Sequence, residues 1–535
     1  MENPIALSIV ALSIILTIYI SYSSRRHTRT TASFYVAGGQ IPWKVNGLAM
    51  LGDYCSAASF LGIAGAIALG GIDGWWIALG FFGAWIAVLL VAAGPLKSAG
   101  KFTIADALIA RFESREIKIL AMISTIILCT LYLVPQIVGA GHLFKLLLGW
   151  AFLPTVIATG VLMALFVILG GMRGTTYNQA IQGMLLWGAM AALLIGASIA
   201  YFGGNPLNII DTAHEMVPPG VAVSEASAVI DKIGAEDAAA VITATREAMP
   251  DAPSALTPGV GLQDMMNQIS LVLGLFLGVL GLPHILIRFY TVRDAQAAQK
   301  STEFTIWGLA TFYAMVLLVG LAAMHLLYPT IIQLLDAGQY GMATNMAVPM
   351  LGELLGGEIF LGIVAAGALA AVLSTSAGLL ISATTSLAHD LYAGIIKSDS
   401  NDQEQLVFAK VGAGLLAVLA IVMAVWLKDV NVGILVGMCF GIAASTFAPA
   451  LLFTLWWRRL TKEGIIAGMT VGLVSSLLFT FARFFGAESI VGIPVLVNPA
   501  LYSVPAAVIA LVAVTYLTKD TGKAEEFMAL AHKKD

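Results

Sequence analysis

The stretch "GLAMLGDYCSAASFLGIAGAIALGG", residues 47–71, is apolar and long enough to cross a lipid bilayer, yet it carries Asp53. A carboxylate inside a membrane span is costly and marks a candidate functional site. Small and polar residues follow it, among them Cys55, Ser56 and Ser59. Such residues suit a helix that unwinds, so that its freed backbone groups line a cavity. The alternative is that Asp53 reaches back to the nearer end of the span or caps a kink.

Apolar runs of this kind recur along the whole chain of 535 residues. The sequence is 59% hydrophobic and 11% charged, with a mean hydropathy of +0.92, whereas soluble domains carry about a quarter charged residues. The runs are too long and too little alternating for the strands of a membrane barrel. We therefore predict an all-α polytopic membrane protein, in which the first run is a transmembrane helix and not a cleaved signal.

Thirteen runs fit transmembrane helices: residues 4–23, 43–70, 74–95, 116–146, 150–170, 176–202, 264–286, 302–328, 354–391, 407–427, 432–457, 463–484 and 496–518. An N-terminus outside the cell places all but five of the 27 lysines and arginines on the cytoplasmic side. The five are Lys145, Lys232, Arg246, Lys428 and Arg483. Cytoplasmic loops are enriched in these residues, so we expect an external N-terminus and a cytoplasmic C-terminus.

Two segments do not span. Residues 101–113, "KFTIADALIARFE", resemble a short amphipathic helix on the cytoplasmic side. Residues 203–263 form a long acidic loop on the outside, in which short surface helices are expected. The three cysteines all fall in apolar runs, so no disulfide framework is expected.

A second polar interruption lies in "GALAAVLSTSAGLLISATTSLAHDLY", residues 367–392. Ala371, Ser374 and Thr375 belong to a face of small and hydroxyl-bearing residues that recur every three or four positions. Hydroxyl and carbonyl oxygens are hard donors that suit Na⁺. The alternative is close helix packing, with each hydroxyl bonded to a carbonyl of its own helix.

Two further motifs carry polar groups. In "LYLVPQIVGAGHLF", Tyr132 and Gln136 lie one turn apart on one helix face and either line a cavity or bridge two helices. In "GLPHILIRFYTVRDAQAAQKS", we place His284 at the cytoplasmic end of a helix and Arg288 in the loop beyond it. We interpret His284 as a structural hydrogen-bonding group, with a proton carrier as the alternative. On this assignment no lysine or arginine lies within a span to pair with an anion.

The motifs "NGLAMLGDYCSAASFLGIAG", "LVPQIVGAGHLF", "LGLPHILIRFYTVRDAQAAQKS" and "SLAHDLYA" together resemble the sodium:solute symporter family. Within it, residues 30–520 are most similar to the bacterial cation/acetate symporters, or acetate permeases. The resemblance implies a leucine-transporter-like fold with two inverted repeats of five helices. The implied organisation is a first helix and loop at 1–42, repeats at 43–202 and 264–457 separated by the loop 203–263, and two helices with a tail at 458–535.

The resemblance also implies two neighbouring binding sites. Sodium would be held by carbonyl oxygens of Gly52, Cys55 and Ala371 and by the hydroxyls of Ser374 and Thr375. The substrate would lie beside Ser56, Ala57 and Ser59 of the break, with Tyr132 and Gln136 across from them. Asp53 would serve hydrogen bonding at the break or attract a cation. Many family members carry an acidic residue where this chain has Gln179, which leaves H⁺ coupling open.

The expected function is therefore secondary active transport by alternating access, a Na⁺-coupled symport of acetate or a similar short-chain monocarboxylate across a bacterial cytoplasmic membrane. Na⁺ is the coupling ion, the lipid bilayer is the surrounding partner, and neither an organic cofactor nor nucleic acid is expected. One alternative is a Na⁺ or H⁺ symporter of pyruvate, lactate or proline. A membrane-embedded enzyme or respiratory subunit is disfavoured because paired haem histidines and cofactor fingerprints are missing, and a passive channel because two broken helices favour alternating access.

Overall fold

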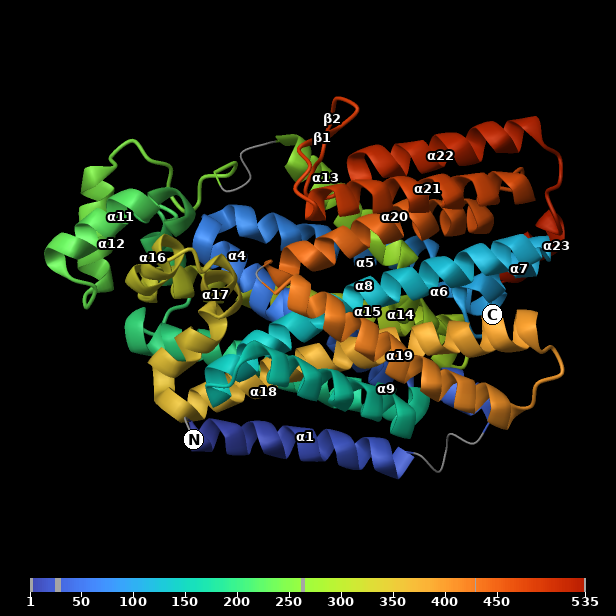
Figure 1. The fold of residues 1–535 in the computed structure, drawn as a ribbon, viewed down its shortest axis with the longest axis horizontal. Coiled ribbons are helices and arrows are strands. Elements are labelled where there is room, and N and C mark those ends of the chain that lie inside the picture. Colours follow the sequence, from blue (N-terminus) through green and yellow to red (C-terminus); the bar gives the residue numbers. More distant parts are fainter. Residues whose placement is uncertain (1–2, 25–29, 261–264, 429, 534–535) are drawn as a thin grey trace.

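The computed structural model describes residues 3–24, 30–260, 265–428 and 430–533, and it is almost entirely helical. Long helices run side by side along one direction, and short helices cap the two ends of the bundle (Figure 1). The predicted loop arginines Arg25, Arg26 and Arg29, the end of the loop 203–263, and Lys534 fall outside the described residues.

The first half contains these elements, where η marks a 3₁₀ or π segment: α1 Pro4–Ser24, α2 Thr31–Val36, η2 Ala37–Gly39, α3 Trp43–Tyr54, η3 Ala58–Gly62, α4 Ile63–Gly70, η4 Gly71–Gly74, α5 Trp75–Val91, α6 Ala93–Ala99, α7 Ile104–Phe112, α8 Arg115–Leu148, α9 Phe152–Tyr201, α10 Asn208–Ala213, α11 Pro219–Ile233 and α12 Ala238–Ala248.

The second half contains α13 Met265–Gly278, η5 Val279–Gly281, α14 Pro283–Leu286, η6 Ile287–Thr291, α15 Ala295–Leu326, α16 Tyr328–Asp336, α17 Tyr340–Asn345, α18 Ala347–Thr385, η7 Ser386–Ile396, α19 Asp402–Trp426, α20 Val432–Trp456, α21 Lys462–Phe484, the two-residue strands β1 Ser489–Ile490 and β2 Ile493–Pro494, α22 Ala500–Leu517 and α23 Ala524–Ala531. The two strands pair antiparallel as a small hairpin.

Within the described residues, ten helices are long and apolar enough to cross a membrane, or eleven if one bent pair counts as a span. The expected count of thirteen is therefore not confirmed. Two of the ten, Ala58–Val91 and Phe152–Tyr201, each cover two expected spans. The second has 50 residues, or about 75 Å of helix against a hydrocarbon core of about 30 Å. Gly71 and Gly171, with φ of 68° and 52°, interrupt the helical backbone between the expected spans.

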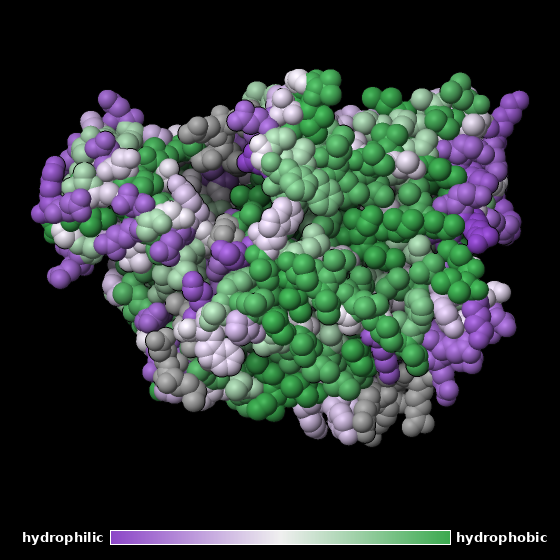
Figure 2. Space-filling view, in the orientation of Figure 1, coloured by the Kyte–Doolittle hydropathy of each residue, from purple (hydrophilic) through white to green (hydrophobic). Residues whose placement is uncertain are grey.

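Surface chemistry follows the bundle axis. Hydrophobic side chains cover the middle of the face shown in Figure 2, and hydrophilic ones gather at both ends. Helices α11 and α12 lie at one of these ends, which confirms the expected surface helices of the loop 203–263. An apolar band between polar ends is what a bilayer-spanning bundle requires.

The centre of the bundle is built around α3, α8, α9 and α18. Helix α18 packs along α9 and α8, and α3 packs along α9. Helix α1 lies outside them against α9 and α18, while α21 and α22 pack together beside α20. This arrangement buries the polar interruptions of α3 and α18 against each other, away from the apolar surface. The division into two inverted repeats stays a prediction.

Candidate functional site

The expected helix break is present between α3 and α4. Helix α3 ends at Tyr54, and Cys55 takes φ −71° and ψ 78°. The N–H of Ser56 donates to the Tyr54 carbonyl at 2.8 Å, which closes an inverse γ-turn. The N–H of Ala57 leaves the helix and donates to Gln136 Oε1 at 3.2 Å. The chain is therefore unwound directly after α3, two residues beyond Asp53, and another helix supplies a partner for its backbone.

Asp53 itself forms a buried ion pair with Arg288. The Nε atom of Arg288 lies 3.1 Å from Asp53 Oδ2, and both side chains are 0% exposed. The placement of Arg288 in a cytoplasmic loop was wrong, as was the expectation of no cation within the spans. The predicted helix 264–286 instead continues through η6 to Thr291, with a bend of 41° beside Pro283. This second broken helix carries Arg288 into the core.

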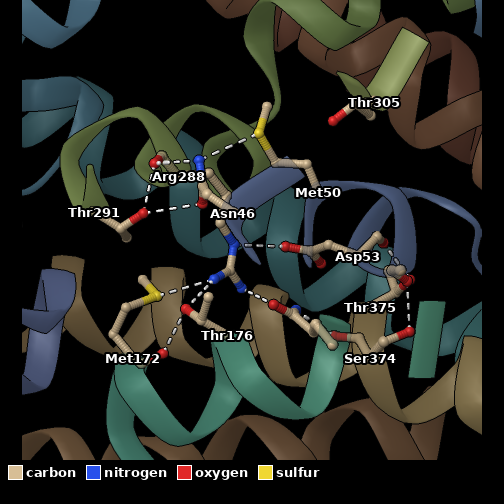
Figure 3. Close-up of polar contacts among 12 residues, drawn as sticks. Asn46, Met50, Asp53, Met172, Thr176, Arg288, Thr291, Thr305, Ser374 and Thr375 are labelled. Atoms are coloured by element: carbon tan, nitrogen blue, oxygen red, sulfur yellow. Dashed lines mark hydrogen bonds and ion pairs between the residues drawn. The ribbon is translucent and has the colours of Figure 1, made fainter. Parts of the chain in front are cut away.

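The guanidinium of Arg288 also reaches α9. Its Nη1 donates to Thr176 Oγ1 at 2.7 Å, and its Nη2 donates to Gln179 Oε1. The amide of Gln179 in turn donates from Nε2 to the Ser374 carbonyl at 2.7 Å. Figure 3 shows Arg288 between Asp53 and Thr176, with Ser374 and Thr375 beyond the carboxylate. One hydrogen-bonded network therefore joins α3, α9, the second broken helix and α18.

Four of the five expected sodium residues meet at this junction. Ser374 Oγ lies 2.6 Å from the Gly52 carbonyl oxygen and 3.0 Å from that of Ala371, and donates to them. Thr375 Oγ1 donates to the Asp53 carbonyl oxygen. Backbone and hydroxyl oxygens of α3 and α18 thus converge, and this donor set has the hard oxygen chemistry that Na⁺ needs. The bond from Thr375 adds the Asp53 carbonyl oxygen to this group. Among the described residues, no hydrogen bond links the carbonyl of Cys55, the fifth expected ligand, to the group.

The expected substrate residues are all buried around the break. Gln136 contacts Ala57 through the bond already described, and Ser56 Oγ accepts from the Ala58 N–H at 3.2 Å. Ser59 Oγ lies 3.0 Å from the hydroxyl of Tyr313 in α15, a contact that was not anticipated. Tyr132 faces the ring of His284, 5.3 Å away between ring centroids.

Sequence reasoning missed Arg288, Tyr313 and the position of His284. The expected structural hydrogen-bonding role of His284 is also wrong, since neither of its ring nitrogens has a partner among the described residues. The signal for Arg288 was a charge imbalance, because a carboxylate placed within a span needs a cation on a neighbouring element. The motif with Pro283 and His284 marks the break that brings this cation inward. Tyr313 lies in an ordinary apolar run of α15, and nothing local distinguishes it.

The model of the "Sodium:solute symporter family" matches residues 34–472. The chain belongs to the sodium:solute symporter family. This symporter is 37% identical over 500 residues to an uncharacterized symporter, YwcA, of Bacillus subtilis (strain 168), covering 92% of the chain and 90% of that relative. It is 35% identical over 525 residues to a monocarboxylic acid transporter of Corynebacterium glutamicum, covering 95% and 90%. Family and relatives are transporters, so the symporter is not an enzyme.

Two solved structures resemble the symporter in fold. A Na⁺-coupled sialic acid symporter, solved in a substrate-bound outward-open state, gives a TM-score of 0.71 at 15% identity and covers 96% of this chain and 98% of its own. Mhp1, a nucleobase-cation-symport-1 transporter solved in a closed conformation, gives 0.51 at 12%, covering 93% and 98%. The fold is leucine-transporter-like, and the family implies sodium and a small solute as partners.

Proposed function

We propose that this symporter imports acetate or a similar short-chain monocarboxylate by Na⁺-coupled alternating access. The observation that carries the proposal is the convergence of the Gly52, Ala371 and Ser374 oxygens beside an unwound helix. The name of the relative from Corynebacterium glutamicum supports the substrate class. The proposed setting is a bacterial cytoplasmic membrane with the N-terminus outside, and Na⁺ is the only ion or cofactor that the proposal needs.

Sodium would couple to the substrate through helix α3. An ion held by oxygens of Gly52, Ala371, Ser374 and Thr375 links α3 to α18, and Cys55 completes the proposed ligand set. The substrate groups Ser56 and Ala57 follow within two residues on the same chain segment. Sodium therefore favours the conformer in which the substrate side of the break is formed, and a bound substrate favours sodium to the same degree.

The break supplies donors that suit a small carboxylate. The backbone of Ala57 contacts Gln136 of α8, and the hydroxyl of Ser59 contacts Tyr313 of α15. Ser56 and Tyr132 complete the proposed substrate groups. Arg288 is not proposed as a substrate ligand, because Asp53 and Gln179 already occupy its guanidinium. Related folds hold carboxylates with helix ends and unwound backbone in the same way.

Labelled uptake into proteoliposomes of the purified symporter tests this function. We expect concentrative uptake of acetate under an inward Na⁺ gradient without a pH gradient, and its loss when choline replaces Na⁺ at equal ionic strength. Excess unlabelled pyruvate, lactate and proline rank the substrates. Uptake driven only by a pH gradient would replace Na⁺ by H⁺, and no uptake of any monocarboxylate under either gradient would remove this substrate class.

A further inference from the structure

His284 is a fully buried imidazole that lacks a partner. Its side chain is 0% exposed, and neither Nδ1 nor Nε2 has a hydrogen-bond partner among the described residues. A neutral imidazole offers one N–H donor and one acceptor nitrogen. Leaving both unpaired in a protein core is costly, and such groups are rare enough to need an explanation.

The surroundings of His284 are those of the proposed substrate site. It lies directly after the bend between Gly281 and Pro283, in the short helix α14 that packs against α3, α8 and α18. Its ring meets that of Tyr132 edge to face at 5.3 Å. One turn further along α8, the Nε2 of Gln136 is also buried and unpaired, although its Oε1 holds the break at Ala57. One unpaired side chain thus contacts Tyr132, and the other lies one helical turn from it.

Aromatic rings close off the rest of this region. Tyr132 lies 5.7 Å from Phe440, and Phe440 lies 4.7 Å from Phe81 and 6.1 Å from Tyr54, measured between ring centroids. All four rings are at most 2% exposed. Such close packing around one amide and one imidazole favours a ligand with a compact anionic head and a very short apolar tail.

We propose that His284 binds the substrate carboxylate together with Gln136, so that one oxygen accepts from the imidazole N–H and the other from the Gln136 amide. This inference rests on the proposed monocarboxylate function and adds a ligand from the second broken helix. It gives the substrate contacts on both breaks, because Gln136 is tied to Ala57 and His284 follows Pro283. A carboxylate thereby holds the two broken helices together across α8.

The test is the KM for labelled acetate at saturating Na⁺ in proteoliposomes of the wild type, His284→Leu, His284→Asn and His284→Gln. Loss of a hydrogen bond to a charged group is expected to raise the KM of His284→Leu roughly ten- to a hundredfold. One of the two amide variants should keep the KM within about threefold of the wild-type value. Asn and Gln each place an N–H near a different ring nitrogen of His284, so only one of them replaces the nitrogen that donates to the carboxylate. The stabilisation of the purified protein by Na⁺ without substrate should be unchanged in His284→Leu.

The matched control is His325→Leu. His325 is likewise packed against an aromatic ring, that of Phe202 at 5.6 Å, and its Nδ1 is unpaired, but it lies at the end of α15. Its KM should equal that of the wild type. A His284→Leu KM within threefold of the wild type overturns the inference, since a packing role alone predicts that result.

The remaining outcomes are also decisive. If His284→Leu does not fold, the Asn and Gln variants must differ at least fivefold in KM, and equal values overturn the inference. If the wild type takes up no monocarboxylate, the proposed function fails and the inference fails with it. Wild-type uptake with an unshifted KM in every His284 variant rejects the inference alone.

Discussion

Arg288 Nε lies 3.1 Å from Asp53 Oδ2 in the centre of the bundle, and neither side chain is exposed. Each residue belongs to a broken helix, so the pair ties the two breaks together. A buried pair of this kind is held by its mutual charge, and removing one partner strands the other.

Single replacements of this pair are expected to destabilise the symporter by about 3–5 kcal/mol each. Asp53→Asn leaves the guanidinium without a counter-charge, and Arg288→Met leaves the carboxylate alone. The double variant should be less destabilised than the sum of the two, because no stranded charge remains. Denaturant or thermal unfolding in detergent measures the stabilities of the wild type, the two single variants and the double variant. Arg293→Met is the nearly neutral control, because that side chain is 81% exposed. Strict additivity of the two losses would contradict the coupling.

Ser374→Ala combined with Thr375→Ala is expected to abolish the stimulation of uptake by Na⁺ while the protein still folds. The double change removes two of the proposed hydroxyl ligands and both hydroxyl bonds to α3. The control is Ser376→Ala, since that hydroxyl bonds to the Val372 carbonyl of its own helix at 2.7 Å. If Na⁺ still stimulates uptake in the double variant, the sodium site lies elsewhere.

Gly378→Ala is expected to disrupt the same centre by steric conflict. A Cβ added at Gly378 of α18 would collide with Asp53 Oδ1, a buried oxygen that cannot move without loosening the ion pair. Gly188→Ala in α9 is the control, because an added Cβ there meets nothing within 4 Å. Expression and melting temperature compare the two variants. Equal stability of both variants would show that α3 and α18 can move apart at little cost in stability.

Asp106 at the start of α7 is expected to stabilise the fold only above acidic pH. Burial raises its pKa, but the hydrogen bond from His389 and those from the N–H groups of Phe102 and Thr103 outweigh burial and hold the pKa below its usual value. A carboxyl with a lowered folded pKa stabilises the folded state above the unfolded pKa of about 4, and this contribution fades as the pH falls through the lower folded value. Asp106→Asn should therefore melt earlier than the wild type at pH 7, with the difference shrinking below about pH 4. A pH-independent difference would assign the effect to packing alone.

The sequence was most informative where local pattern and three-dimensional role coincide. Small and polar residues around Asp53 predicted the helix break, an inference that needs only the cost of polar groups in lipid. That Ser374 and Thr375 would meet this break was implied by the resemblance to the family, because helix periodicity alone also fitted plain packing. The structure brings these groups within hydrogen-bond distance, as expected.

The remainder depended on contacts between distant segments. Hydropathy places Arg288 in a loop because a charged residue ends an apolar run. Its burial is offset by the charge of Asp53, 235 positions away, and by hydrogen bonds to Thr176 and Gln179. Single-sequence patterns do not encode that proximity. The orphaned ring of His284 was equally hidden, since the missing partners of a side chain are visible only after the chain has folded.

The buried break has a practical consequence for following transport. The chain has only three cysteines, and all are free and buried, with Cys55 in the break itself. A water-soluble alkylating reagent therefore finds no accessible thiol in this conformation. Modification of Cys55 requires the break to open, so the alkylation rate of Cys55 in the unmodified protein reports how readily the break opens. Na⁺ and substrate should change this rate, and no engineered label is needed to follow it.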